Sequence, residues 1–344
     1  INEVSMYSAM SKFADVYYNN QKIDFSLPNF GVDPKRPVTP PDKKYDFHYI
    51  RHNPDILHKI NGPKACLATP YNESCYKGAD AVVVYTESWK SLMDGKKDPV
   101  VPGLSKSKIF PPKKVILFDQ VIPDNFKPLK GHPKTKQYRK RFGGDFIIGN
   151  FGRLSQGTYP HSLLVVIKKL QSEFPGVKIK FFHAGKNKGV KTKFDSIGLI
   201  KYSDMPFAVS ACDIVTCNSR QDTANWAGCK DVLEGMACGI PVLTGDYSVR
   251  KEQFGENYEL FWPHKLPNNG RISDEAESVM LNILRKAVSD PKSLDRVSKK
   301  IIYRSKYYRA DNVAKRMESE IISVIDSCRN KSVSYTHLRA HETS

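Results

Sequence analysis

The chain has 344 residues and a formal net charge of +18, and 40% of its residues are hydrophobic. This length exceeds what one hydrophobic core usually organises, so we expect a globular protein with two domains. No apolar run approaches the roughly 20 residues that a membrane-spanning helix requires, which excludes such a helix from this sequence.

The positive charge is concentrated in one segment. Residues 96–141 hold thirteen Lys or Arg and three Asp, and the segment is rich in proline and poor in helical pattern. It is either a solvated linker region or a surface for anionic lipid or another polyanion. Nucleic acid is the least favoured partner, because no nucleic-acid-binding motif accompanies the charge.

The seven cysteines form no Cys-x-x-Cys pair, and their number is odd. Such spacing favours free thiols in a reducing compartment over a framework of disulfide bonds. We therefore expect a cytoplasmic protein.

Short apolar runs alternate with helical patterns in the first third of the chain. Apolar residues at helical spacing predict a helix over residues 7–19. Strands are predicted, in chain order, at residues 45–50, 65–69, 79–85 and 114–118, with a helix at 87–93. Residues 121–128 have the composition of the start of a linker.

A second alternation of strands and helices starts at Asp145. Strands are predicted at residues 146–151, 177–183, 213–217, 242–243 and 258–262. Helices are predicted after Pro160, over 205–211, from Lys230, and after the capping residues Asp274 and Asp311. This alternation predicts an α/β protein with doubly wound parallel sheets.

The stretch from Cys212 to Leu243 has the pattern strand, loop, short helix, glycine and strand. Gly239 and Pro241 end the helix, as the crossover between two parallel strands requires. Ligands of such sheets bind at the carboxyl ends of the strands, where helices present their N-termini. We therefore expect the functional site around residues 219–234.

Three features are expected to converge at that site. Gly152 and Arg153 follow a predicted strand, where glycine permits close approach of a ligand and arginine grips phosphate oxygens. The N–H groups at the start of the helix near Lys230 also favour phosphate. Glu234, expected in the first turn of that helix, would repel phosphate, so its expected partners are ribose hydroxyl groups. Together they predict a nucleotide-diphosphate ligand, although Arg153 paired with a carboxylate and Glu234 complementing the helix dipole remain alternatives.

These residues resemble a known family. The run from Ala211 to Val242, which contains Glu234-Gly235-Met236-Ala237-Cys238-Gly239, resembles the donor-site motif of the retaining group 1 glycosyltransferases of GT-B fold. Residues 148–154 resemble the family's G-R-L turn, residues 121–126 its V-I-P linker, and residues 51–54 its H-N-P loop. The resemblance covers about residues 45–327 and is strongest in the C-terminal half.

The resemblance implies a GT-B fold, in which two Rossmann-like, doubly wound domains face each other across a cleft. It implies an incomplete, amino-terminally truncated acceptor-side domain at residues 1–128, a linker at 129–144 and a nucleotide-sugar-binding domain at 145–327. The last helices are expected to return to the first domain. Residues 328–344 look like read-through of non-coding sequence, and we leave them out of the predicted fold.

The implied reaction is retaining, hexosyltransferase-like transfer of a sugar from a nucleotide-diphosphate sugar to a glycan, lipid or protein acceptor. The implied donor-binding residues are Gly152, Arg153, Gly185, Leu199, Asp222, Val232, Leu233 and Glu234. Arg153 would hold the diphosphate and Glu234 the ribose hydroxyls. Gly185 and Leu199 would shape the base pocket, and backbone amides of the helix would support the nucleotide.

Catalysis would depend on positioning and on stabilising the charge of the leaving diphosphate. The resemblance implies Arg153, Asp222 and His52 as catalytic residues, with His52 in the loop near the reacting sugar. It implies no metal ion and no cofactor besides the donor itself.

The sequence departs from the family at two positions in that site. Thr158 stands where the family has a lysine, five residues after the arginine of the G-R-L turn. Trp226 stands where the family has its first glutamate, eight residues before Glu234. The nearest replacements are Asp222 for the carboxylate and Lys186, Lys188 or Arg220 for the ammonium group.

Two alternatives to an active enzyme therefore stay open. One is a glycosyltransferase-like binding protein without turnover, which Thr158 and Trp226 motivate. The other is an adaptor that binds an anionic membrane surface or another polyanion through residues 96–141. The expected location is cytoplasmic, with peripheral binding to the cytosolic face of a membrane as an option.

Overall fold

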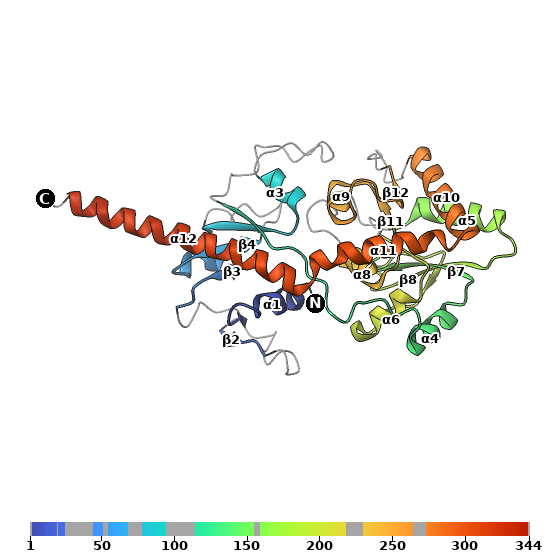
Figure 1. Cartoon of the computed structure of the whole chain (residues 1–344), viewed down its shortest axis with the longest axis horizontal. Helices are drawn as coiled ribbons and strands as arrows, with labels where there is room; N and C mark the ends of the chain where they lie inside the picture. The colour runs from blue at the N-terminus through green and yellow to red at the C-terminus, as the bar shows by residue number, and fades with distance from the viewer. Residues whose placement is uncertain are drawn as a thin grey trace. The chain divides into compact units, whose positions relative to one another are not determined.

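The computed structural model describes residues 2–18, 20–24, 44–50, 54–67, 78–93, 114–154, 159–217, 230–263 and 273–342. The chain divides into two compact units (Figure 1). The first unit consists of Ile1–Val121 and Ala310–Ser344, and the second of Ile122–Arg309. Parallel sheets covered by helices form both units, so the α/β prediction is confirmed. In the described part of the chain, no helix combines the length and the apolar character needed to cross a bilayer.

The sheet of the first unit has four parallel strands in the order in which they occur in the chain. They are β3 (His48–Ile50), β4 (Lys64–Leu67), β5 (Ala81–Val84) and β6 (Val115–Leu117), with η2 (Pro54–Lys59) before β4 and α3 (Glu87–Met93) after β5. β5 is buried along its whole length, as its continuous apolar sequence predicts for a central parallel strand. This order corresponds to one half of a doubly wound sheet.

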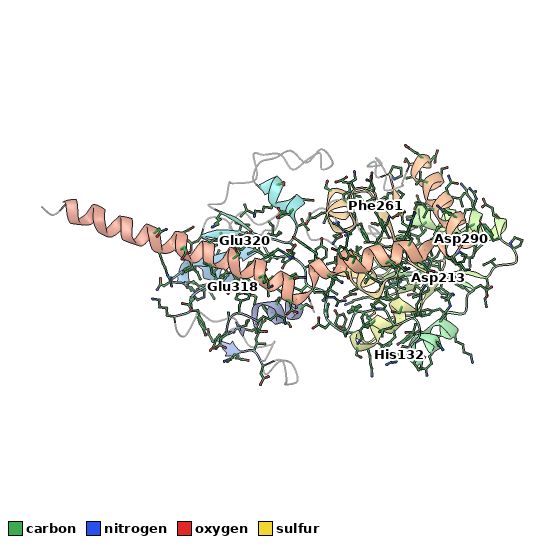
Figure 2. All side chains as sticks on the ribbon, viewed as in Figure 1. His132, Asp213, Phe261, Asp290, Glu318 and Glu320 are labelled. Atoms are coloured by element: carbon green, nitrogen blue, oxygen red, sulfur yellow. The ribbon has the colours of Figure 1, made fainter. Side chains whose placement is uncertain are left out.

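Two helices from opposite ends of the chain complete the first unit. α1 (Asn2–Met10) packs against α12 (Ala310–Glu342), and both contribute to the core of this sheet. The predicted apolar stripe of α12 is buried: Val313, Met317, Ile321 and Val324. Lys90 of α3 reaches Glu320 of α12 at 3.1 Å, and Figure 2 labels Glu320.

Three predictions for the first unit are wrong. α1 ends at Met10, and β1 (Tyr17–Tyr18) pairs antiparallel with β2 (Gln21–Lys22) instead of continuing the helix. Asn20 turns the chain there with φ +67°, a conformation that asparagine tolerates better than most residues. Asp311 lies inside the first turn of α12 and forms an ion pair with Lys12 at 2.6 Å, so it is not the cap. α12 also runs on to Glu342, so most of the segment left out of the predicted fold is helical.

The sheet of the second unit has six parallel strands in the order β12–β11–β10–β7–β8–β9. The strands are β7 (Phe146–Phe151), β8 (Ile179–Ala184), β9 (Asp195–Ser196), β10 (Ile214–Thr216), β11 (Val242–Gly245) and β12 (Phe261–Trp262). Strand order runs outward in both directions from β7, so it reverses between β7 and β10. This is the predicted doubly wound order, and sheets of this order bind ligands beyond the carboxyl ends of the strands at the reversal, here β7 and β10.

Helices cover both faces of this sheet, as the complete burial of β7 requires. They are α4 (Pro133–Phe142), α5 (His161–Glu173), α6 (Met205–Ser210), α8 (Lys230–Cys238), α9 (Ser248–Phe254), α10 (Asp274–Ser289) and α11 (Ser293–Ser305), with the 3₁₀ turns η5 (Tyr202–Asp204) and η6 (Lys306–Tyr308). α5 packs on α10, while α8 contacts both α6 and α11. The structure adds α9 and α11 to the predicted helices, and Ser273, rather than Asp274, caps α10 by accepting from the Ala276 N–H at 3.2 Å.

The predicted linker at residues 129–144 is instead mostly helix α4, which belongs to the second unit. His132 caps it by accepting from the Lys134 N–H at 3.1 Å, and Gly143 ends it with φ +66°. Arg139 attaches the helix to the start of β10 through an ion pair with Asp213 at 3.0 Å, and Figure 2 labels both His132 and Asp213. Only Thr135 and Phe142 of α4 are buried, so the helix has almost no apolar stripe to reveal it.

Candidate functional site

The candidate site lies at the carboxyl edge of the sheet in the second unit. Gly152 and Arg153 follow β7 directly, and Gly185 follows β8. α8 crosses from β10 to β11, so its N-terminus lies at this same edge. The structure therefore brings together two of the three features that the sequence predicted to converge, the Gly152–Arg153 turn and the N-terminus of α8, and places Gly185 beside them.

The turn after β7 is held by the strand beside it. Gly152 has φ +121°, and its N–H donates to the Ala184 carbonyl at 2.9 Å. Gly185 lies so close to this turn that a Cβ atom there would overlap the carbonyl oxygen of Gly152. Only glycine fits at position 185, and the fixed turn leaves Arg153 exposed at the edge of the sheet.

Two lysines lie next to Arg153 because Leu154 bonds to the backbone between β8 and β9. The Leu154 N–H donates to the Lys186 carbonyl at 2.9 Å, and the Lys188 N–H donates to the Leu154 carbonyl at 2.9 Å. Lys186 and Lys188 are both exposed. The two lysines expected to compensate for Thr158 therefore lie beside the turn that carries Arg153.

A buried histidine, which the sequence patterns did not predict as a site residue, holds the turn in place. His183 in β8 is fully buried, with Nε2 3.0 Å from the Gly152 carbonyl and Nδ1 3.4 Å from the Ser196 hydroxyl. Burial lowers the pKa of His183, so the ring is neutral and one ring N–H donates to the carbonyl. A histidine beside the apolar residues at the end of a predicted strand, two residues before Gly185, was the signal.

The segment predicted to shape a base pocket meets the same turn. The Gly185 N–H donates to the Gly198 carbonyl at 2.8 Å. Leu199 follows with 78% of its surface exposed, while Ile200 packs against the core. An exposed leucine beside a glycine turn offers an apolar surface to a planar ligand.

Glu234 lies in the second turn of α8, not in the first, because the described helix begins at Lys230 and its first-turn acid is Asp231. It is only 5% exposed, and the Tyr202 hydroxyl donates to its Oε1 at 3.1 Å. Burial raises the pKa of Glu234 to about 7. Burial and the nearby carboxylate also raise the pKa of Tyr202, which therefore stays a hydroxyl donor.

Lys230 completes this group and was also missed, although its position four residues before Glu234 places both on one helix face. Its Nζ lies 5.3 Å from the centre of the Tyr202 ring. Burial lowers the pKa of Lys230, whereas attraction to Glu234 opposes that shift. In return, Lys230 lowers the pKa of Glu234 against the larger effect of burial.

At Val232 and Leu233 of α8, only the backbone can reach a ligand. Val232 and Leu233 are fully buried, so their side chains belong to the core. Their N–H groups are among the first four of the described helix, which lack acceptors inside a helix. The predicted role of these two residues depends on those amides alone.

α9 adds a buried arginine to this edge. Arg250 is fully buried and donates to the Cys217 sulfur at 3.4 Å and to Gln253 at 2.5 Å. Cys217 directly follows β10, so the guanidinium adds positive charge beneath the candidate site.

The remaining predicted residues lie outside the described part of the chain: His52, Thr158, Arg220, Asp222 and Trp226. Among the described residues, no three His, Cys, Asp or Glu side chains are grouped to hold a metal ion.

Comparison with known proteins agrees with this geometry. Residues 133–302 match the family model described as glycosyl transferases group 1. The matched region includes the Gly152–Arg153 turn, the segment around Leu199, and α8.

An uncharacterized glycosyltransferase of Methanocaldococcus jannaschii is 23% identical over 206 residues, which cover 58% of this chain and 47% of that protein. The chain thus spans about half the length of this curated relative.

Solved structures share the fold. The O-GlcNAc transferase GtfA of pneumococcus superposes with a TM-score of 0.56 at 12% identity, over 78% of this chain and 54% of that one. A glycosyltransferase of Rickettsia africae gives a TM-score of 0.57 at 15% identity, over 81% of this chain and 76% of that one. The α,α-trehalose 6-phosphate synthase of Burkholderia multivorans gives a TM-score of 0.58 at 10% identity, over 83% of this chain and 72% of that one. The fold is GT-B, and residues 133–302 match the family model of the group 1 glycosyltransferases.

Proposed function

We propose that the chain transfers a sugar, with retention of configuration, from a nucleotide-diphosphate sugar to an acceptor. The observation that carries this proposal is the fixed turn at Gly152, which presents Arg153 at the same sheet edge as the N-terminus of α8. A guanidinium and helix amides are two standard partners of phosphate oxygens. Their meeting at the switch point of a doubly wound sheet favours a diphosphate bound between them.

The proposed donor contacts assign one part of the ligand to each feature. Arg153 holds the diphosphate, with Lys186 and Lys188 supplying the charge that Thr158 lacks. Leu199 packs against the base. The amides of Val232 and Leu233 bind the phosphate end, because their side chains face the core.

Glu234 is proposed to bind the ribose hydroxyl groups, and its surroundings define how. Because the carboxylate is 5% exposed and accepts from Tyr202, the ribose reaches it by replacing the tyrosine hydroxyl. One hydrogen bond is exchanged for another, so the cost is the movement of Tyr202. The bond to Tyr202 keeps the carboxylate satisfied while no nucleotide is bound.

Catalysis in this proposal needs no metal ion and no cofactor besides the donor. Arg153 and the amides of α8 stabilise the charge on the leaving diphosphate. His52 and Asp222 are proposed to lie beside the reacting sugar, as the family resemblance implies. The acceptor is a glycan, lipid or protein, and the proposed location is cytoplasmic, with the option of peripheral binding to a membrane.

A thermal-shift panel of nucleotide sugars on the full chain tests the donor site. UDP-GlcNAc is the first donor to test, because the similar pneumococcal O-GlcNAc transferase was solved with UDP and GlcNAc. A ligand at about 100 times its Kd stabilises the folded state by about 2.7 kcal/mol, which raises the Tm by several degrees. Arg153→Ala should abolish the shift, whereas Arg141→Ala, an exposed arginine at the end of α4, should keep it.

Donor hydrolysis then separates an enzyme from a binding protein without turnover. If a nucleotide sugar raises the Tm but is neither hydrolysed nor transferred, the chain binds donor without turnover. If no diphosphate nucleotide raises the Tm, the proposed donor site is wrong.

A further inference from the structure

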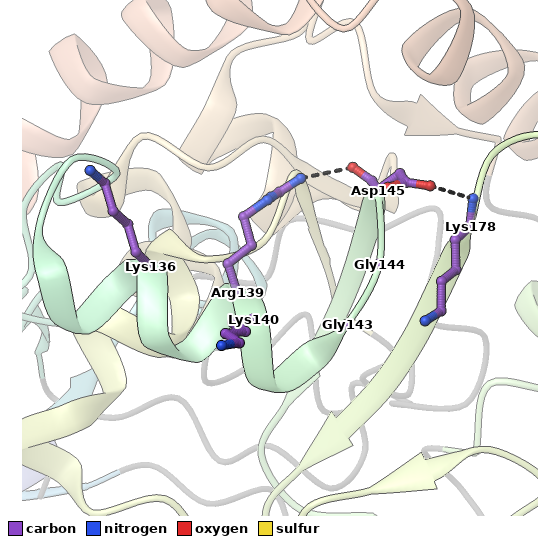
Figure 3. A pocket seen from close by; sticks show the side chains of 7 residues that line it. All are labelled: Lys136, Arg139, Lys140, Gly143, Gly144, Asp145 and Lys178. Atoms are coloured by element: carbon purple, nitrogen blue, oxygen red, sulfur yellow. Dashed lines mark hydrogen bonds between the residues drawn. The ribbon is translucent and has the colours of Figure 1, made fainter.

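A second charged feature lies at the opposite edge of the same sheet, away from the proposed donor site. A hollow of about 390 Å³ lies between α4 and the residues that precede β7 and β8 (Figure 3). It is lined by Lys136, Arg139, Lys140, Gly143, Gly144, Asp145 and Lys178. β7 has six residues, so at roughly 3.3 Å per residue the hollow and the Gly152 turn are about 20 Å apart.

Two of the lining residues are already engaged within the protein. The Arg139 guanidinium donates to Asp213 at 3.0 Å and to the Asp145 carbonyl at 2.8 Å. The Asp145 carboxylate accepts from the Lys178 backbone N–H at 2.9 Å, and Figure 3 shows both contacts of Asp145. The positive charge that remains for a ligand therefore comes from the lysine side chains.

Three lysines line the hollow, and their ammonium groups have no carboxylate partner among the described residues. Lys136, Lys140 and Lys178 are exposed, and none of them forms an ion pair with any residue that the structure describes. Lys136 and Lys140 are four residues apart on α4, where like charges repel and destabilise a helix. Basic residues in the last turn of a helix complement its dipole, which explains a lysine at position 140 but not at positions 136 or 178. Binding of an anion would explain a lysine at all three positions.

Two consecutive glycines, Gly143 and Gly144, line the hollow with backbone and no side chain. Gly143 takes φ +66° to end α4. A Cβ atom at Gly144 would come within 2.9 Å of the Lys180 Cβ, so a larger residue does not fit there without a shift. Both positions thus expose backbone, which lets an anion approach closely.

We propose that this hollow is a second anion site, which binds a phosphate group through Lys136, Lys140 and Lys178. Phosphate fits because it carries close to two negative charges and three acceptor oxygens, which match three ammonium groups from two segments. The hollow is large enough for the phosphate and a small substituent. Its source is either the phosphate monoester headgroup of phosphatidic acid or a soluble phosphate monoester.

The sequence offers a single reporter for this site. Gly144 alone among the 21 glycines is preceded by another glycine. In protein labelled with carbonyl-13C, 15N-glycine, an HNCO spectrum therefore contains one peak, from the Gly144 amide at the floor of the hollow. Inorganic phosphate, titrated at ionic strength held constant with sodium chloride, should move this peak in a saturable way.

Matched variants decide whether the lysines bind the phosphate. The triple variant K136Q/K140Q/K178Q should weaken phosphate binding at Gly144 by about tenfold or more. The control K168Q/K169Q/K299Q removes three exposed lysines elsewhere on the second unit and should leave the titration unchanged. Arg153→Ala should also leave it unchanged, and the triple variant should keep the nucleotide thermal shift, because the two sites are separate.

Vesicles separate the two sources of phosphate. Co-sedimentation is compared between phosphatidylcholine vesicles with and without phosphatidic acid. If the chain sediments only with phosphatidic acid, and the triple variant does not, the headgroup is the ligand. If Gly144 responds to phosphate but no vesicle binds, a soluble phosphate compound is the ligand.

The proposal is overturned by any of three results. They are a Gly144 peak that phosphate does not move, an equal movement in the triple variant, and an equal movement with chloride alone. Vesicle binding that the triple variant retains also contradicts the headgroup as the ligand.

Discussion

The two edges of the sheet in the second unit carry charge in different ways. At the carboxyl edge, buried partners control the charged groups: Tyr202 and Lys230 surround Glu234, and His183 fixes the turn before Arg153. At the amino edge, the lysines around the hollow are exposed and have no ion-pair partner among the described residues. Buried groups define geometry and are little screened by salt, whereas exposed groups contribute a field that salt weakens. A substitution should therefore have larger, salt-independent effects at the carboxyl edge.

The largest expected effect is that of Gly185→Ala. The added Cβ would overlap the Gly152 carbonyl, so the turn must move and Arg153 moves with it. We expect nucleotide binding to weaken at least about a hundredfold and the free energy of unfolding to fall by about 1–3 kcal/mol. Isothermal calorimetry and chemical denaturation measure the two. Gly176→Ala, where an added Cβ meets nothing within 4 Å, is the control and should behave like the parent.

His183→Leu should be the next most severe change. It leaves the Gly152 carbonyl without its imidazole donor, which costs about 1 kcal/mol of stability. Nucleotide affinity should fall about tenfold, because the turn that presents Arg153 loses its support. The exposed His161→Leu is the matched control. If His183→Leu lowers stability but leaves nucleotide affinity unchanged, His183 has only a structural role.

Glu234 predicts a pH dependence of stability with a definite sign. Burial raises its pKa from 4.5 to about 7, so between these values the folded protein binds the proton that the unfolded chain releases. The stabilising effect of the proton is complete below pH 4.5 and is lost as pH rises to about 7, for a total on the order of 3 kcal/mol. In Glu234→Gln this dependence should be absent. Parallel unfolding curves of both proteins at pH 5 and pH 8 test it, and an equal pH dependence would contradict the buried, raised carboxyl.

Tyr202→Phe should produce the smallest change, and in the opposite direction. Without the hydroxyl, a ribose no longer has to displace a hydrogen bond from Glu234. At pH 8.5, where the carboxyl is ionised, nucleotide affinity should rise by about two- to fivefold. Tyr303→Phe, on the exposed face of α11, controls for the loss of a hydroxyl elsewhere. Weaker binding in Tyr202→Phe would instead mean that the hydroxyl contacts the nucleotide directly.

The sequence predicted those parts of the fold that depend on local patterns. β7 and α12 have continuous or periodic apolar residues, and the structure buries those residues as expected. The Gly152–Arg153 turn was predicted because a strand end and its glycine are adjacent in the chain. Helix α4 was not predicted, because it has almost no apolar stripe. Its caps and the Arg139–Asp213 ion pair stabilise it instead.

The partners of the site residues could not be predicted, since they come from distant segments. His183 meets Gly152 only because β8 pairs with β7, and Tyr202 meets Glu234 across 32 residues of chain. The sequence predicted that Glu234 binds ribose hydroxyls but could not show that the Tyr202 hydroxyl already donates to it. Lys230 was visible at helical spacing from Glu234, yet its position over the Tyr202 ring depends on the fold.

The second unit is one continuous segment whose two ends are bonded to each other. The Ile122 N–H donates to the Tyr308 carbonyl at 2.9 Å, and Arg309 donates to the carbonyls of Pro123 at 3.0 Å and Phe126 at 2.6 Å. A segment with adjacent termini can be inserted into another protein, or removed from one, without stretching either chain. The connectivity of residues 122–309 is therefore that of a domain that can be moved between proteins as one segment. This segment includes the whole region that matches the family model. Joining its ends by a short peptide and opening the ring elsewhere would give a circular permutant that needs no part of the first unit to close.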